Sequence, residues 1–179
     1  AKVLAAQIGW CDIDEEWAYA SATTITVPTG AASRFQVGDK LRFTQTTVKY
    51  FYVVGVADTV LTVTGGADYT VANAAISSIA YSRCERPFGF PEWFAYSPSH
   101  VGFSANPGVV ARFCLKGKLC TVNYYTVSPG TSNAATFRVS APIAPTTTYG
   151  RASYGNAVAV DSGAACADSW CFVDGAGVA

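Results

Sequence analysis

Alternating hydrophobic and polar positions dominate the first half of the chain and predict short β-strands. The runs that alternate, or are rich in β-branched and aromatic residues, are "TTITV", "KLRFTQ", "VKYFYVVGV" and "LTVTGG". Glycine, aspartate and proline separate these runs, as they separate the strands of an antiparallel sheet. We therefore predict a small barrel-like β module over residues 21–82, preceded by an N-terminal arm of residues 1–20.

The second half of the chain returns to the β pattern. "VARFCLKG" and "KLCTVNYYTV" predict a long hairpin, "ATFRVSAPIA" predicts another strand, and "NAVAVDSG" and "SWCFVDG" predict two short ones. No sustained helical period appears. We predict a connector over residues 83–90 and a module resembling a β-sandwich or jelly roll over residues 91–179. The predicted fold class is all-β, with two small antiparallel modules.

Between the two sets of strands, residues 86–113 combine many aromatic rings with four prolines. Proline is confined to the edges of sheets and to connectors, so we expect this segment to join the modules. Its rings are expected to pack at the base of the second module or against a neighbouring subunit; the alternative is an exposed ligand surface. The residues of this interface or ligand surface are Phe90, Trp93, Phe94, Tyr96 and Phe103.

The composition of the chain limits which classes of molecule are expected to bind it. Charged residues make up 13% of the chain, and the net charge is zero, which gives no electrostatic basis for binding nucleic acid. No run of apolar residues is long enough to cross a membrane. Low charge also leaves strand edges unprotected against pairing with other chains, so we expect a homo-oligomer.

Six cysteines raise the question of disulfides. If residues 116–118 form a three-residue turn, Cys114 faces Cys120 across the hairpin, although two free buried thiols fit the sequence equally well. Cys166 and Cys171 are a second local pair. The chain has one histidine and no Cys-x-x-Cys motif, so a zinc site is not indicated. We expect no cofactor.

Catalytic chemistry is not indicated either. His100 has no nucleophile motif beside it. Glu92, next to Trp93, is the best of the candidate carboxylates for glycoside hydrolysis, but none of these carboxylates has a sequence context that marks it as catalytic. The acidic cluster over residues 12–16 lacks the spacing of a calcium-binding loop. We therefore predict that the protein is not an enzyme.

Several phrases, in order, carry a resemblance: "GWCDIDEEWAYASATTITVP", "VGDKLRFTQTTVKYFYVVGV", "LTVTGGADYTVANAAIS" and "GFPEWFAYSP…ARF". Over roughly residues 9–140, the chain resembles virion structural proteins of tailed bacteriophages and prophages, of the tail-appendage or surface-decoration type. The resemblance implies a β-structured, externally displayed protein of the extracellular particle. It also implies partners among other virion proteins and a trimeric assembly.

These observations together predict a surface-displayed structural protein of a phage virion, either a tail fibre or appendage or a capsid decoration. It would assemble with other particle subunits and contact the host surface, with a host glycan as one ligand. The alternative is a secreted or cell-surface carbohydrate-binding module, in which Trp93, Tyr96, Tyr124 and Tyr125 line an aromatic patch.

Overall fold

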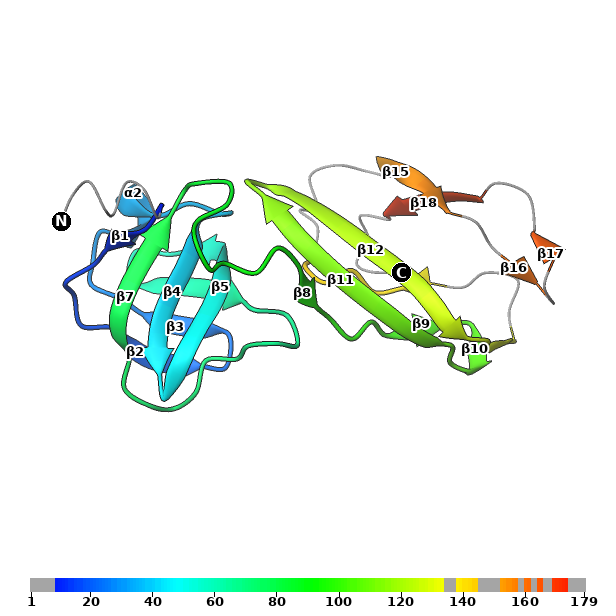
Figure 1. Ribbon diagram of the computed structural model, residues 1–179, viewed down its shortest axis with the longest axis horizontal. Helices are drawn as coiled ribbons and strands as arrows, with labels where there is room; N and C mark the ends of the chain where they lie inside the picture. The colour runs from blue at the N-terminus through cyan, green and yellow to red at the C-terminus, as the bar shows by residue number, and fades with distance from the viewer. Residues whose placement is uncertain are drawn as a thin grey trace. The chain divides into compact units, whose positions relative to one another are not determined.

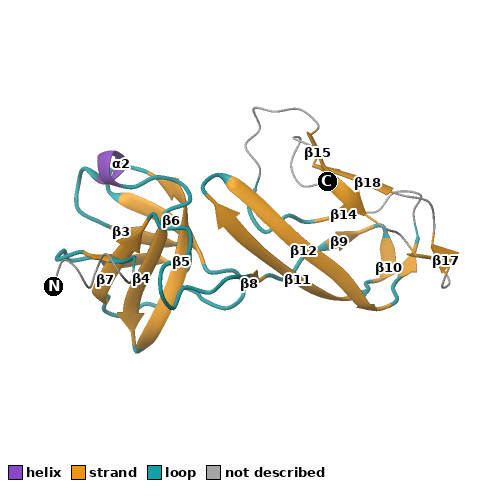
Figure 2. Ribbon diagram, turned by 45° about the horizontal axis from the view of Figure 1, so that its top comes forward, coloured by secondary structure: helices purple, strands orange, loops and turns teal. Residues whose placement is uncertain are grey.

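The computed structural model describes residues 9–133, 138–144, 152–157, 160–161, 164–165 and 169–173. Nearly all regular structure in these residues is β-strand, arranged in several antiparallel sheets (Figures 1 and 2). The one helix among them is α2, the four-residue turn Ala31–Arg34. The predicted all-β fold class is confirmed.

A seven-stranded sheet forms the body of the first half of the chain. Its order is β1-β7-β4-β5-β6-β3-β2, and every neighbouring pair is antiparallel. The order has two ends, so the described strands do not form a closed barrel. The strands are β1 (Cys11–Asp12), β2 (Ala18–Ser21), β3 (Thr24–Thr26), β4 (Lys40–Gln45), β5 (Thr47–Val56), β6 (Val60–Thr64) and β7 (Ser77–Ser82).

One core gathers side chains from strands across this sheet, including β7 and β3, which lie four positions apart in its order. Ile25 of β3, Phe43 of β4 and Phe51 of β5 are each no more than 1% exposed. The rings of Phe43 and Phe51 stack with centroids 5.0 Å apart. A sheet whose distant strands share a core must curl around it, and this is how burial of alternate residues on each strand holds the sheet together.

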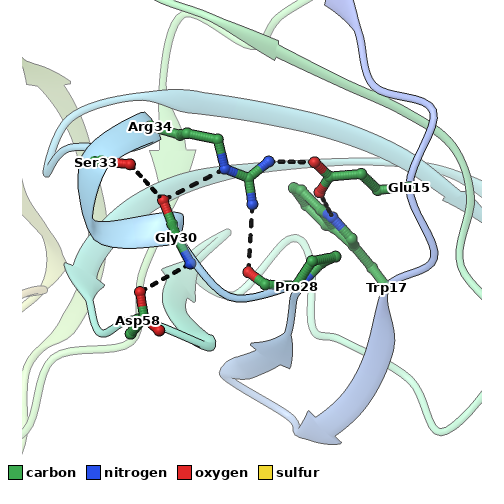
Figure 3. Close-up of polar contacts among 7 residues, drawn as sticks. All are labelled: Glu15, Trp17, Pro28, Gly30, Ser33, Arg34 and Asp58. Carbon is green, nitrogen blue, oxygen red and sulfur yellow. Dashed lines mark hydrogen bonds and ion pairs between the residues drawn. The ribbon is translucent and has the colours of Figure 1, made fainter.

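Polar contacts anchor α2 to the segment before β2 (Figure 3). The guanidinium of Arg34 forms an ion pair with Glu15 and donates to the carbonyl oxygens of Gly30 at 3.4 Å and Pro28 at 3.3 Å. The other carboxylate oxygen of Glu15 accepts a hydrogen bond from Nε1 of Trp17 at 3.0 Å. Glu15, from the acidic cluster, therefore has a structural partner on each of its oxygens.

A three-stranded sheet, of order β12-β11-β8, begins within the aromatic segment, because β8 and most of β11 belong to that segment. Its strands are β8 (Phe94–Ala95), β11 (Gly108–Lys116) and β12 (Leu119–Ser128). The predicted hairpin over these residues is confirmed, but its turn is Gly117–Lys118, one residue shorter than predicted. Gly117 has φ 59°, and glycine at the first turn position is what a tight type II′ hairpin turn requires.

The remaining described strands pair as separate two-stranded ladders. β9 (His100–Val101) pairs with β14 (Arg138–Val139), β10 (Phe103–Ala105) with β13 (Thr131–Ser132), β15 (Ala152–Ala157) with β18 (Ser169–Val173), and β16 (Val160–Asp161) with β17 (Ala164–Ala165). β-structure is therefore present where the sequence predicts it, and the β-sandwich itself stays a prediction.

The chain divides into two compact units at residues other than the predicted module boundaries. One unit comprises Ala1–Ser97 with Val110–Tyr125, and the other comprises Pro98–Val109 with Thr126–Ala179. Residues 83–90, which the sequence assigns to a connector, thus belong to the first unit. The physical reason is the packing of the aromatic rings described next.

Candidate functional site

The aromatic segment covers the outer face of β5. Strand residues alternate between the two faces of a sheet, so Phe51 points into the core while Tyr50 and Tyr52 point away from it. The rings of Phe90 and Phe94 lie over Tyr52, with centroids 5.0 Å and 5.3 Å away. Both faces of β5 are thus covered, which explains why its middle residues are hydrophobic without a polar alternate.

The covering rings and those beneath them form one set, called here the ring cluster. Edge-to-face and tilted ring pairs, the geometry that aromatic quadrupoles favour, connect its members. They are Trp10, Tyr50, Tyr52, Tyr69, Phe90, Phe94, Tyr96 and Phe113. Three of the five predicted interface residues, Phe90, Phe94 and Tyr96, therefore pack within the first unit.

Lys40 is a buried charged residue that packs against the ring cluster. It is 5% exposed, and its Nζ donates to the carbonyl oxygen of Cys84 at 2.9 Å. The same Nζ lies 5.8 Å from the ring centroid of Tyr52 and 5.7 Å from that of Phe90, the geometry of cation–π contacts. Burial lowers the pKa of Lys40 from its usual value. These contacts hold the cation in place structurally.

Trp93 behaves differently from its neighbours. It is half-buried, and with Arg112, Asn123 and Tyr125 it lines a groove of about 220 Å³, called here the Trp93 groove. The alternation along β11 explains the groove, because Phe113 points inward and is fully buried while Arg112 points outward and is exposed. Asn123 and Tyr125 are two residues apart on β12 and so share one face.

The fifth predicted surface residue, Phe103, lies in the second unit. Its ring contacts that of His100 edge-to-face, with centroids 5.9 Å apart. The five predicted residues therefore do not form one surface. Phe90, Phe94 and Tyr96 belong to the ring cluster, Trp93 lines the Trp93 groove, and Phe103 packs against His100.

The cysteines of the hairpin are free thiols. In a hairpin with the two-residue turn Gly117–Lys118, Leu115 lies opposite Cys120, so Cys114 falls on the other face of the ladder. The pairing considered from the sequence required a three-residue turn, and the structure has the other alternative, two free thiols. Cys114 and Cys120 are both half-buried, and burial raises the pKa of Cys120 to about 11. The second predicted disulfide rests on Cys166, which lies outside the described residues.

The acidic cluster borders a shallow pocket of about 550 Å³ between the segment of β1 and the start of β7. Arg42 lies at this pocket, with a guanidinium nitrogen 3.8 Å from Asp12 and its charge 4.9 Å from the ring centroid of Trp10. Within the described ranges, no three histidine, cysteine, aspartate or glutamate residues are grouped so that they could hold a metal ion.

Comparison with protein-family models, curated proteins and solved structures finds no match for this chain. In the described part of the chain, none of the helical structure is long and apolar enough for a membrane span.

Sequence reasoning missed the residues that complete each arrangement. The sequence predicts a strand over Tyr50 and Tyr52, and the place of Tyr52 between the core residues Phe51 and Val53 signals a second covered face. Arg112 stands between the buried Ala111 and Phe113, and this alternation is the signal that places it on the outer face. Asn123 carries no distinctive signal in the sequence, because its role depends on the strand that lies beside it.

Proposed function

We propose that the protein is a structural, externally displayed component of a phage particle, and that it assembles with further copies of itself. The sequence phrases over residues 9–140 that resemble virion proteins support the assignment to a phage particle. The all-β architecture, whose rings are used to cover a sheet, fits a scaffold.

The observation that carries the assembly is strand β12. It is ten residues long, contains no charged residue, and is the end strand of its sheet in the described structure. Its hydrophobic side chains remain in solvent: Leu119 is 57% exposed, Val122 43% and Val127 62%.

A long, uncharged end strand presents unpaired backbone groups that another strand can pair with. Proteins that stay monomeric protect such an edge with charge, proline or a bulge. β12 has none of the first two, and the net charge of zero adds no long-range repulsion between copies. A neighbouring copy of the chain is the occupant we propose, with a trimer as the expected assembly.

Val122→Lys tests this assembly, because it places a charge on the uncharged strand. We expect the subunits of the variant to associate at least about tenfold more weakly, corresponding to roughly 1.4 kcal/mol, in sedimentation-velocity experiments over a range of concentrations. Val48→Lys is the matched control, since Val48 is 46% exposed but lies on β5. A wild-type protein that remains monomeric throughout would refute the assembly.

The place in a particle needs a separate test. Purified virions of the source phage, or particles induced from the source prophage, should contain this chain in mass spectrometry after extensive washing. Its absence from particles, together with its presence on cells or in culture medium, would favour the carbohydrate-binding module instead.

A further inference from the structure

We propose that the Trp93 groove binds an acidic sugar, by stacking the sugar ring on an aromatic face and pairing its carboxylate with Arg112. This inference goes beyond assembly and does not depend on it. It concerns side chains on the outer face of the β12-β11-β8 sheet, whereas the proposed assembly pairs the backbone groups at the edge of β12.

The groove brings together the side-chain types that recognise sugars. Trp93 and Tyr125 offer flat apolar faces with polar tips, which suit the C–H face of a pyranose ring. Arg112 offers a planar fork of N–H donors, and the Asn123 amide offers both donors and an acceptor. All four residues belong to the first unit and line the same cavity.

The polar groups of the groove are uncommitted. In the described part of the chain, the side chains of these four residues make no hydrogen bond or ion pair. Glu92, the carboxylate next to Trp93 in sequence, pairs with Arg86 at 3.4 Å instead. The charge of Arg112 is therefore available to a ligand.

The size of the groove limits the ligand. Its volume of about 220 Å³ is below the range of roughly 300–1,000 Å³ for pockets that hold drug-sized molecules. One sugar residue at the end of a chain is the ligand that matches this volume, and the remainder of a glycan would extend into solvent.

Arg112, the cationic side chain of the groove, favours sugars that carry a carboxylate. Guanidinium and carboxylate form two parallel hydrogen bonds, a geometry that neutral hydroxyl groups do not reproduce. Uronic acids and sialic acids both carry a carboxylate on the ring, so the chemistry they share is the recognised feature. An exposed ion pair is weakened by salt, so binding should weaken as ionic strength rises.

Binding is measured by isothermal titration of the full chain with the methyl glycosides of glucuronic acid, a sialic acid and glucose. We expect binding to one or both acidic glycosides that is at least about tenfold stronger than to the glucoside. The two acidic arms distinguish a uronic-acid ligand from a sialic-acid ligand.

Two variants assign the binding to the groove. Arg112→Gln should abolish the preference for acidic glycosides, and Tyr125→Ala should weaken binding of all of them by about tenfold. Lys118→Gln, which removes the same charge from the exposed turn of the same hairpin, is the control and should bind as wild type. The proposal is overturned by absence of binding, by equal binding of glucoside and acidic glycosides, or by equal losses in Arg112→Gln and Lys118→Gln.

Discussion

The ring of Phe94 packs against the ring of Phe113 with centroids 6.0 Å apart, and both residues are fully buried. Phe94 belongs to β8 and Phe113 to β11, and the two residues pair directly across the ladder. This contact fastens the aromatic segment to the hairpin, while Tyr52 beneath it fastens the segment to the seven-stranded sheet.

Phe94→Ala should therefore destabilise the first unit strongly. The expected loss in the free energy of unfolding is about 3–5 kcal/mol, the usual cost of removing a fully buried ring. Urea denaturation followed by tryptophan fluorescence measures it. Phe88→Ala, from the same segment but 76% exposed, should change stability by less than about 0.5 kcal/mol. Equal losses in the two variants would contradict the ring cluster.

Gly38, just before β4, lies close to Gly117 in the turn between β11 and β12, and substitutions can test this close approach. Gly38 has φ +96°, and a Cβ added to it would lie 2.3 Å from the carbonyl oxygen of Gly117. Gly38→Ala should cost about 2–4 kcal/mol, from backbone strain and a clash together. Gly117→Ala carries strain at φ +59° but meets nothing within 4 Å, so about 1–2 kcal/mol is expected. Thermal melts that rank the two variants in the opposite order would refute this close approach.

The hydrogen bonds of the Asp58 carboxylate should make the free energy of unfolding depend on pH in the acidic range. The hydroxyl of Thr29 and then the backbone N–H of Gly30 lower the pKa of Asp58 by hydrogen bonding (Figure 3 shows the Gly30 bond). Because the folded pKa lies below the unfolded value of about 3.9, this stabilisation is present above that pH and is lost as pH falls through the folded pKa.

Asp58→Asn should accordingly flatten the loss of stability between about pH 4 and pH 2, measured as the urea midpoint at each pH. Glu16→Gln is the control, since Glu16 is an exposed carboxylate of the acidic cluster. It should retain the slope of the wild type. A slope unchanged in Asp58→Asn would show that these hydrogen bonds do not form in solution.

Cys120 should resist alkylation. Burial raises its pKa to about 11, so at pH 8 about one thiol in a thousand is ionised. Cys84, like Cys11, is exposed and should react with iodoacetamide before Cys120 does, as followed by mass spectrometry of peptides over time. In denaturing urea the two rates should converge. Rapid labelling of Cys120 in the native protein would show that its side of the hairpin is open.

Much of the local structure was predictable from the pattern of residues. "KLRFTQ" and "VKYFYVVGV" predict the strands found as β4 and β5, because alternation and β-branching depend on neighbours in sequence. The hairpin of β11 and β12 was predictable for the same reason. The predicted turn is one residue longer than the observed one, and that single step moves Cys114 and Cys120 to opposite faces, since side chains alternate along a strand.

The candidate sites depended on contacts that the sequence does not encode locally. The hydrophobicity of Phe90 and Phe94 predicts that both rings are buried. It does not predict that they cover Tyr52, because burial against any apolar surface lowers the free energy of a ring. The same reasoning applies to Trp93, whose neighbours Arg112 and Asn123 come from two later strands.

The sequence by itself determined the all-β class, the positions of the principal strands and the low charge that favours association. Only the tertiary structure decided that the aromatic segment covers the outer face of β5 and that Trp93 lines a groove. It also decided that residues 83–97 belong to the first unit. Strand formation follows from the alternation of neighbouring side chains, whereas the pairing of surfaces depends on shape and on chain closure between residues far apart in sequence.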